Sequence, residues 1–450
     1  MNDRLARLAL MRSAEPGDAL MGGLVASLGA QAMVERVRAG RPDPALVRLL
    51  TGSDDDDGGG TGGEGGGAVV NGGGVGGAVG DGGADGNGCG GHGGRGAGEG
   101  GHDAGGGGAG GSREERIAGR LRRAFASWSA RLEQADPRRD LTEGERNGAR
   151  LVIPGDPEWP TQLDDLGRAR PYALWLHGDA DLRFSCLRSV ALVGSRAATP
   201  YGAHVAAEFG AGLSGRGWTV VSGGAYGVDG AAHRGALAGD APTVAVLACG
   251  VDVAYPSAHH QLFAAVRGHG VLVSECPMGS HPTRPRFLIR NRLIAALSRG
   301  TVVVEAAVRS GALSTARHAL SLNRVLGAVP GPVTSETSAG CHRLIRQGAA
   351  VCVTTPEETI ELTGALGADL ARESRGPVLP RDELEPETRR VLEAVPARGG
   401  AGPAAIAVVA GVGMDTALAC LGGLAAAGYI ERVSRGWRLR PEGPRSPSGR

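Results

Sequence analysis

A repeated pattern of strand, glycine turn and helix between Ser189 and Leu237 constrains the fold more than any other feature of the sequence. The first apolar run stops at Gly194-Ser195-Arg196, after which Thr199-Pro200 offers a capping oxygen and a proline at the first helical position. The second apolar run stops at Ser222-Gly223-Gly224, before another helical segment. Glycines beside a helix N-terminus form a backbone geometry that binds phosphate groups, so both turns are candidate phosphate sites.

The same alternation of strand and helix extends from Ala149 to Leu366, with apolar runs that begin near residues 190, 219, 243, 271, 301, 326 and 350. A repeat of roughly 24–30 residues suits right-handed crossovers between parallel strands, so it predicts a sheet covered on both faces. Arg150–Ile153 and Ala173–Leu176 are predicted to add edge strands. The predicted fold class for residues 149–366 is therefore α/β, an extended Rossmann-like, doubly wound and mostly parallel sheet.

The segment before the sheet divides into helical and low-complexity parts. Residues 1–50 and 113–148 carry helical periodicity and are predicted to form one N-terminal helical unit. Residues 51–112 separate them and hold 33 of the 80 glycines of the chain. Such a composition buries too little apolar surface to fold, so it predicts a disordered insertion.

The segment after the sheet predicts a second, smaller domain. Residues 367–385 are rich in proline, glutamate and arginine and predict a linker. Residues 386–440 show three helical patterns followed by a two-stranded hairpin, which is the order of a winged-helix-like domain. Residues 441–450 are predicted to be a disordered tail.

Composition excludes several classes of protein. The chain has 450 residues, a formal net charge of +1 and no lysine, which rules out a Walker A loop and any lysine Schiff base. The seven cysteines form no C-x-x-C pair, and no metal-binding set has workable spacing, so neither a metal nor another cofactor is predicted. No signal peptide or run of about 18 apolar residues is present. A cytoplasmic protein without a membrane partner is the expectation.

The two glycine turns lack the sequence features that recognise a dinucleotide cofactor. No G-x-G-x-x-G follows Val193, and Ser222-Gly223-Gly224 stands where an acidic residue would bind a ribose hydroxyl. Phosphate-binding geometry therefore remains without the parts that recognise a nucleoside. Hydride transfer with a nicotinamide cofactor is not predicted.

A basic segment between residues 284 and 292 contains four arginines and Phe287. Arginines with an interleaved aromatic residue are typical of single-stranded nucleic-acid binding, in which cations contact phosphates and the ring stacks on a base. The alternative places Phe287 in the core and pairs the arginines with carboxylates such as Glu275 or Glu305. The chemistry of the segment leaves both interpretations open.

Three sites carry candidate catalytic groups. Glu305 follows a strand and precedes the turn at Ser310-Gly311, and we expect it to orient an arginine of the preceding helix rather than to act as an acid or base. Asp229 and His233 are four residues apart, and we favour a cap and pair that brace the neighbouring glycine turn over a proton relay. Cys341-His342 is a poor nucleophile–base pair, because adjacent helical side chains point apart.

Six motifs follow one another between about residues 145 and 365: ALVGSRAATPYG, SGGAYGVDGAAHRGAL, LACGVDVAYPSAHHQL, SECPMGSHPTRPRFLIRNRLIAALS, VVVEAAVRSGALSTARHAL and VPGPVTSETSAGCHRLIRQGA. In this order and spacing they resemble the DNA-processing protein A family (DprA/Smf). The resemblance implies a protein without a catalytic step that binds and protects single-stranded DNA. It also implies loading of the RecA recombinase in natural transformation or DNA recombination, and a homodimer formed through the Rossmann-like domain.

The resemblance also implies which residues contact DNA. Those expected at phosphates are Gly194, Ser195, Arg196, Ser222, Gly223, Gly224, Arg290, Asn291, Arg292, Ser310 and Gly311. Arg284 and Phe287 occupy the positions of a basic residue and a base-stacking phenylalanine that precede the Arg-Asn-Arg motif. The chain departs from the family pattern at Leu288, where proline is usual, and at His260, where asparagine is common.

Two other functions compete with this interpretation. A nucleotide hydrolase similar to the phosphoribohydrolases would use Glu305 or Asp229 on the same kind of sheet, but their Gly-Gly-x-Gly-Thr-x-x-Glu motif is absent. A transcriptional regulator would read duplex DNA with the helix predicted at Met414–Ala427, which carries no arginine or lysine. A protein–protein role suits that domain better.

Overall fold

The computed structural model describes residues 1–40, 42–52, 113–365, 367, 369–371 and 380–441, and it divides into two compact units, Met1–Ala371 and Arg372–Arg450. The insertion predicted for 51–112 and the tail predicted for 441–450 lie almost wholly outside the described residues. The linker predicted for 367–385 lies partly outside them. Each unit has a hydrophobic core of its own.

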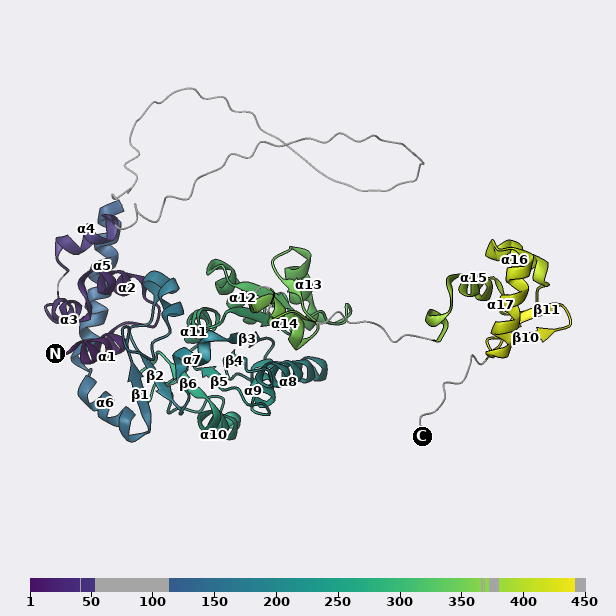
Figure 1. The fold of residues 1–450 in the computed structure, drawn as a ribbon. Coiled ribbons are helices and arrows are strands. Elements are labelled where there is room, and N and C mark those ends of the chain that lie inside the picture. Colours follow the sequence, from purple (N-terminus) through teal and green to yellow (C-terminus); the bar gives the residue numbers. More distant parts are fainter. Residues whose placement is uncertain (41, 53–112, 366, 368, 372–379, 442–450) are drawn as a thin grey trace, which may run out of the picture. The chain divides into compact units, whose positions relative to one another are not determined.

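A single nine-stranded sheet organises the first unit (Figure 1). Its strands are β1 (Ala149–Val152), β2 (Leu174–His177), β3 (Ser189–Val193), β4 (Thr219–Ser222), β5 (Thr243–Val246), β6 (Val271–Ser274), β7 (Gly300–Val303), β8 (Val325–Ala328) and β9 (Val351–Cys352). They lie in the order β1-β2-β6-β5-β4-β3-β7-β8-β9. All pairs from β6 to β9 are parallel, whereas β1–β2 and β2–β6 are antiparallel. The predicted Rossmann-like, mostly parallel fold is confirmed, but β2 lies inside the sheet and not at its edge.

Helices cover both faces of the sheet, so the sequences of its central strands are continuous apolar runs. In β3, Val190 and Leu192 pack into one cluster while Ala191 and Val193 pack into another on the opposite face. The first face is covered by α8 (Pro200–Ser214), α9 (Val228–Ala236), α10 (His260–His269) and α14 (Pro356–Thr363). The second is covered by α7 (Leu182–Leu187), α11 (Arg284–Leu297), α12 (Ala312–Ser321) and α13 (Ala339–Arg346).

Among the described residues, six helices precede the sheet and pack together, four before the glycine-rich segment and two after it in sequence. They are α1 (Asp3–Ser13), α2 (Ala19–Leu28), α3 (Ala30–Arg38), α4 (Pro44–Gly52), α5 (Arg113–Glu133) and α6 (Pro137–Arg146). Phe125 and Trp128 on the apolar face of α5 share a core with Leu10 and Leu24 of the earlier helices. Leu8 on α1 packs instead against β2, which joins these helices to the sheet in one compact unit.

The described part of the second unit contains three α-helices and a hairpin. They are α15 (Pro386–Ala394), α16 (Pro403–Ala410), α17 (Met414–Ala426), β10 (Ile430–Val433) and β11 (Gly436–Leu439). The two strands pair antiparallel across a turn at Ser434 and Arg435, and Ile406 and Leu421 lie at the centre of the core. This order of elements is the one that the sequence predicts.

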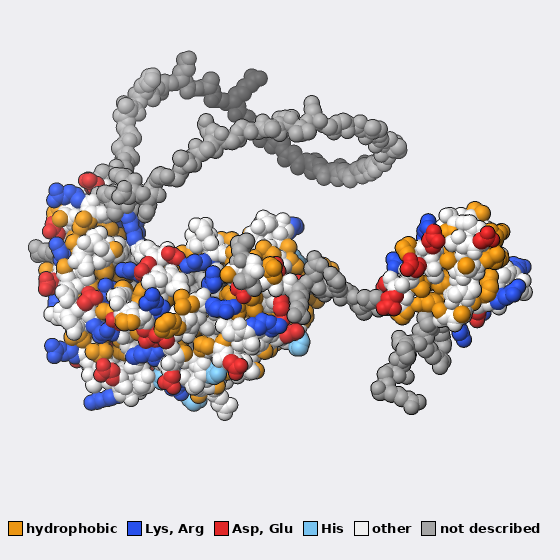
Figure 2. Space-filling view, viewed as in Figure 1, with side chains coloured by type: hydrophobic (Ala, Val, Ile, Leu, Met, Phe, Trp, Pro, Cys, Tyr) orange, Lys and Arg blue, Asp and Glu red, His pale blue; other side chains and the backbone are white. Residues whose placement is uncertain are grey.

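Hydrophobic side chains remain exposed on the second unit (Figure 2). On α16 and α17 they include Val408, Val409, Met414 and Leu418. No single helix in the described ranges is long and apolar enough to cross a membrane; α16 and α17 pass that test only as a pair bent by 106°. A helix as apolar as α17 offers no cation to a DNA duplex.

Candidate functional site

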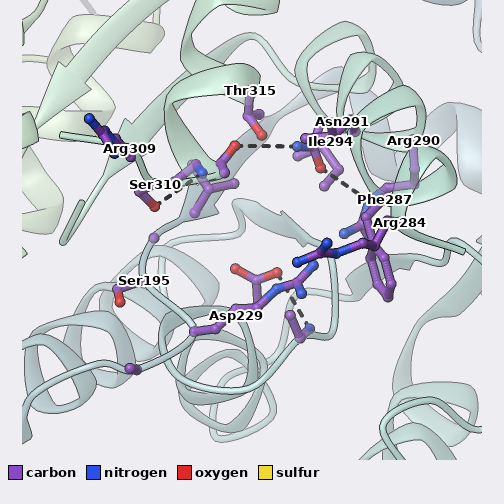
Figure 3. Close-up of a pocket in the computed structure, with 18 of the residues that line it drawn as sticks. Ser195, Asp229, Arg284, Phe287, Arg290, Asn291, Ile294, Arg309, Ser310 and Thr315 are labelled. Atoms are coloured by element: carbon purple, nitrogen blue, oxygen red, sulfur yellow. Dashed lines mark hydrogen bonds between the residues drawn. The ribbon is translucent and has the colours of Figure 1, made fainter. Parts of the chain in front are cut away.

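The main cavity of the first unit lies where the strand order reverses. After β3 the chain builds β4, β5 and β6 to one side and then returns to β7 on the other side of β3. Ligands of open α/β sheets bind beyond the carboxyl ends of the strands at such a reversal. A cavity of about 710 Å³ occupies this position, lined by the segments after β3 and β7 and by α11 (Figure 3).

The turn after β3 forms the first wall of the cavity. Ser195 donates its backbone N–H to the carbonyl of Glu305 at 2.7 Å, which fastens the turn to the segment after β7. A Cβ at Gly194 would lie 2.5 Å from the side chain of Val228, so this close approach requires glycine. Arg196 is exposed beyond the turn, and its guanidinium carbon lies 4.4 Å from the centre of the Phe287 ring.

Helix α11 forms the second wall. Arg284, Phe287 and Asn291 recur at helical spacing and line the cavity from one face of the helix. Arg290 also lines it but is only 4% exposed and donates to the carbonyls of Gly223, at 2.8 Å, and of Val246. Burial lowers the pKa of Arg290, and the nearby Asp229 carboxylate opposes that shift. Arg290 therefore braces the turn after β4.

The segment between β7 and α12 forms the third wall. Arg309 is exposed at the cavity, and the Ser310 hydroxyl accepts from the backbone N–H of Ala312 at 3.3 Å. Asn291 donates its side-chain amide to the carbonyl of Gly311 at 3.4 Å, which ties α11 to the start of α12. Figure 3 shows Arg309 and Arg284 at opposite sides of the cavity.

The predicted site residues divide into two groups in space. Nine of them line the cavity: Gly194, Ser195, Arg196, Arg284, Phe287, Arg290, Asn291, Ser310 and Gly311. Ser222 does not, because its buried hydroxyl donates to the carbonyl of Leu192 at 2.6 Å. Gly223 lines a smaller neighbouring cavity instead, and Gly224 packs against Phe263.

Arg292 lies apart from the cavity. Two nitrogens of its guanidinium donate to the two carboxylate oxygens of Glu275 at 2.6 Å each, and its Nε donates to the carbonyl of Ala169 at 3.0 Å. Both members of this ion pair are buried. The alternative interpretation of the basic segment, in which an arginine pairs with Glu275, thus holds for Arg292.

The role expected for Glu305 is wrong. This carboxylate is buried and accepts the backbone N–H and the hydroxyl of Thr199 at 2.9 and 2.6 Å, together with the hydroxyl of Thr337 at 3.1 Å. It therefore fastens the start of α8 and does not orient an arginine. Because Glu305 does not line the cavity, it is also badly placed to act on a ligand there.

The expected pairing of Asp229 with His233 is wrong as well. His233 lies 2.8 Å from the hydroxyl of Thr243, through its Nδ1. Asp229 accepts from the backbone N–H of Ala225 at 3.4 Å, so the part of the prediction in which it braces the glycine turn holds. Burial raises the pKa of Asp229, and the charges of Arg290 and Arg196 and its backbone hydrogen bonds oppose that rise.

The electrostatic character of the cavity comes from three exposed arginines. Arg196, Arg284 and Arg309 belong to three different segments, and within the described ranges none of them is paired with a carboxylate. Asp229 is the carboxylate among the lining residues, and it is buried. Arg309 was missed from the sequence, although its position directly before the Ser310-Gly311 turn is a usable signal. The arrangement suits several anionic groups spaced around one opening.

Comparison with known proteins identifies the family. The sequence model of the family described as DNA recombination-mediator protein A matches residues 150–364. A putative DNA processing protein DprA of Mycobacterium tuberculosis is 48% identical over 304 residues, which cover 65% of this chain and 78% of that protein. The chain belongs to the DprA/Smf family. The resemblance of the six motifs is thereby confirmed.

Further DprA/Smf proteins match this chain over shorter ranges. Protein Smf of Escherichia coli is 43% identical over 213 residues, which cover 47% of this chain and 56% of that protein. Among solved structures, DNA processing protein A of Streptococcus pneumoniae matches with 33% identity and a TM-score of 0.49, over 56% of this chain and 86% of that chain. The protein of Helicobacter pylori, described for its single-stranded DNA binding mode, matches with 30% identity and a TM-score of 0.43, over 47% and 94% of the two chains.

Proposed function

We propose that this DprA/Smf protein binds single-stranded DNA in the cavity beyond the carboxyl ends of β3 and β7 and loads RecA on it, in natural transformation or DNA recombination. The observation that carries the proposal is the set of three exposed arginines around one opening, Arg196, Arg284 and Arg309, which pair with no carboxylate among the residues that the structure describes. A flexible single strand can bring successive phosphates to cations on separate segments, as proteins with basic grooves require. The family is described as one of recombination mediators, which supports the same role.

The proposed contacts differ in kind along the strand. The turn after β3 offers the Ser195 hydroxyl, since its backbone N–H is already donated to the Glu305 carbonyl, and the start of α12 offers the positive end of a helix to phosphate oxygens. Arg196 and Arg309 add charge-assisted hydrogen bonds beside these two turns. Arg290 supports the binding surface from below, because its donors are already used by the carbonyls of Gly223 and Val246.

Substitution of single arginines tests the site. Arg196→Ala or Arg309→Ala should lower the affinity for an oligo-dT by about tenfold at low salt, since each removes one charge-assisted contact. The slope of log affinity against log salt should fall by about 0.7 per lost phosphate contact. Arg299→Ala is the matched control, because Arg299 is exposed directly before β7 begins, at the strand end opposite to the cavity.

A gel-shift series across salt, on single-stranded and double-stranded DNA, measures these effects. Affinity and salt slope that stay unchanged in both variants would refute the site. RecA loading is measured as ATP hydrolysis by RecA on single-stranded DNA, with and without this protein. We expect stimulation by the unaltered chain and the Arg299 control, and its loss in the Arg196 and Arg309 variants.

The remaining parts of the proposal concern the whole protein. We assign it no catalytic step, since its buried carboxylates Glu305 and Asp229 are engaged by hydrogen bonds. Release of free base from a nucleoside monophosphate would instead support a hydrolase.

The proposal also includes a homodimer formed through the sheet domain. It assigns the second unit a winged-helix-like fold and a protein-binding role, and it places the protein in the cytoplasm. Sedimentation of the purified chain tests the dimer.

A further inference from the structure

The hairpin of the second unit carries a group of arginines that the function proposed above does not use. Arg432 lies on β10, and Arg435 lies in the turn before β11. Arg398 precedes a segment that runs beside β11, where Ala401 donates its backbone N–H to the carbonyl of Trp437 at 2.9 Å and accepts from the Trp437 N–H at 2.8 Å. We call these three arginines the basic hairpin end.

Glycines bring the segment after Arg398 against the turn of the hairpin. Gly436 has φ of +121°, and a Cβ there would lie 2.1 Å from the carbonyl oxygen of Ala401. A Cβ at Gly400, where φ is +113°, would lie 3.7 Å from the Cβ of Arg435. The approach at Gly436 leaves no room for a side chain. The segment that follows Arg398 is therefore held against the turn that carries Arg435.

The positive charge of the basic hairpin end is not compensated nearby. Its three arginines are exposed, and none of them pairs with a carboxylate in the described part of the chain. After α15 the carboxylates of the described chain are Asp415, on α17, and Glu431, which accepts from the Nε of Arg438 at 2.6 Å. The guanidinium carbon of Arg432 lies 5.9 Å from the centre of the Trp437 ring, a cation–π contact that leaves its charge in place. This end of the unit is therefore a cationic surface.

We propose that the basic hairpin end is a second contact for single-stranded DNA and binds phosphates of the strand where it continues beyond the cavity of the first unit. The proposal rests on the proposed function, because the strand held by the first unit is the nucleic acid offered to the second. The two units belong to one chain, so binding in the cavity raises the effective concentration of the strand at the hairpin. Contacts that are weak by themselves then add measurable affinity.

The helices of the second unit argue against a duplex as the ligand of this surface. In helix-turn-helix proteins a recognition helix enters the major groove. Helix α17 has no arginine or lysine, and Met414 and Leu418 are exposed on it. Its insertion would bring apolar side chains and the Asp415 carboxylate against a polyanion. A flexible single strand can instead bring its phosphates to the hairpin alone.

The test compares the affinity of the full chain for a short and a long oligo-dT, of about 8 and about 25 residues, so that only the long strand extends beyond one site. The double variant Arg432→Ala with Arg435→Ala should weaken binding of the long strand by about tenfold and leave binding of the short strand unchanged. The salt slope on the long strand should fall by about 0.7 for each lost phosphate contact. Arg390→Ala is the matched control, an exposed arginine of the same unit that lies on α15, 3.7 Å from Glu387.

Variants that keep the charge separate binding from folding. Arg432→Lys with Arg435→Lys should retain the salt slope on the long strand, because both cations remain. Equal losses on the two strand lengths, or no loss on either, would overturn the assignment of the hairpin. A loss seen only on a duplex of the long length would overturn it in favour of a duplex contact. Failure of the unaltered chain to bind the short strand would overturn the proposed function itself, so the two failures are distinguishable.

Discussion

His233 shows how strongly one buried side chain responds to its surroundings. Its ring is fully buried; Nδ1 lies 2.8 Å from the Thr243 hydroxyl, which donates to the carbonyl of Val220, and Nε2 has no hydrogen-bond partner within the described residues. Burial lowers the pKa of His233 to about 3, and the neighbouring His259 and Arg290 act in the same direction. The His233 imidazole is therefore neutral in the folded protein, whereas in the unfolded chain it has the ordinary pKa of histidine.

This shift predicts a loss of stability in mild acid. The pKa of His233 in the folded protein lies below its unfolded value near 6.5, so the unfolded chain binds more protons between pH 6.5 and about 3. The free energy of unfolding therefore falls as the pH decreases through that window. Between pH 7.5 and pH 5 the fall should be about 2 kcal/mol. Urea unfolding at several pH values measures it. His233→Asn should flatten the dependence, whereas His204→Asn, at an exposed position on α8, should retain it; equal slopes in all three proteins would contradict the prediction.

At the scale of elements, the glycines of the turns allow two backbone segments to approach each other closely. Gly227 precedes α9 with φ of +75°, and a Cβ there would lie 2.2 Å from the carbonyl oxygen of Ser195 and 2.6 Å from that of Arg196. The backbone N–H of Val228 donates to the same Ser195 carbonyl at 3.1 Å. The start of α9 therefore sets the position of the turn that carries Arg196.

Gly227→Ala should consequently damage both stability and binding. The positive φ and the contact with two carbonyls should lower the free energy of unfolding by about 2 kcal/mol or more. Displacement of Arg196 should also weaken oligo-dT binding. Gly217→Ala is the matched control, since Gly217 has φ of +74° but open space around it, and it should lose stability without losing affinity. Urea unfolding and gel shifts on both variants measure the difference; equal affinities would show that the contact does not position Arg196.

Helix α11 shows how much of the site the sequence could predict. The 3.6-residue period places Arg284, Phe287 and Asn291 on one face, and all three line the cavity. Arg292 points elsewhere, toward Glu275. No local rule could choose among the arginines, because their partners come from loops far away in the sequence. Arg290, for example, donates to the ends of β4 and β5, whose positions depend on how the whole sheet assembles.

At the scale of the whole molecule, strand positions were predictable and strand order was not. Each apolar run of the sheet domain forms a strand; the central runs are short and buried on both faces, whereas β9 at the sheet edge is exposed. The place of β2 inside the sheet depends on antiparallel pairing with β6, whose partner residues lie about a hundred positions later in the chain. Such long-range pairing produces no periodic pattern in the sequence of the strand itself.

The two compact units should unfold separately, because each has its own core. Ile406 is fully buried in the small second unit, so Ile406→Ala should cost it about 2–5 kcal/mol. A domain of this size has little stability to lose, and its thermal transition should fall by about 10 °C or more. The transition of the first unit and its affinity for single-stranded DNA should not change. Val408→Ala, on the same helix but 81% exposed, is the control and should leave both transitions in place. Calorimetry of the full chain measures both, and a single transition that moves as one would show that the two cores fold together.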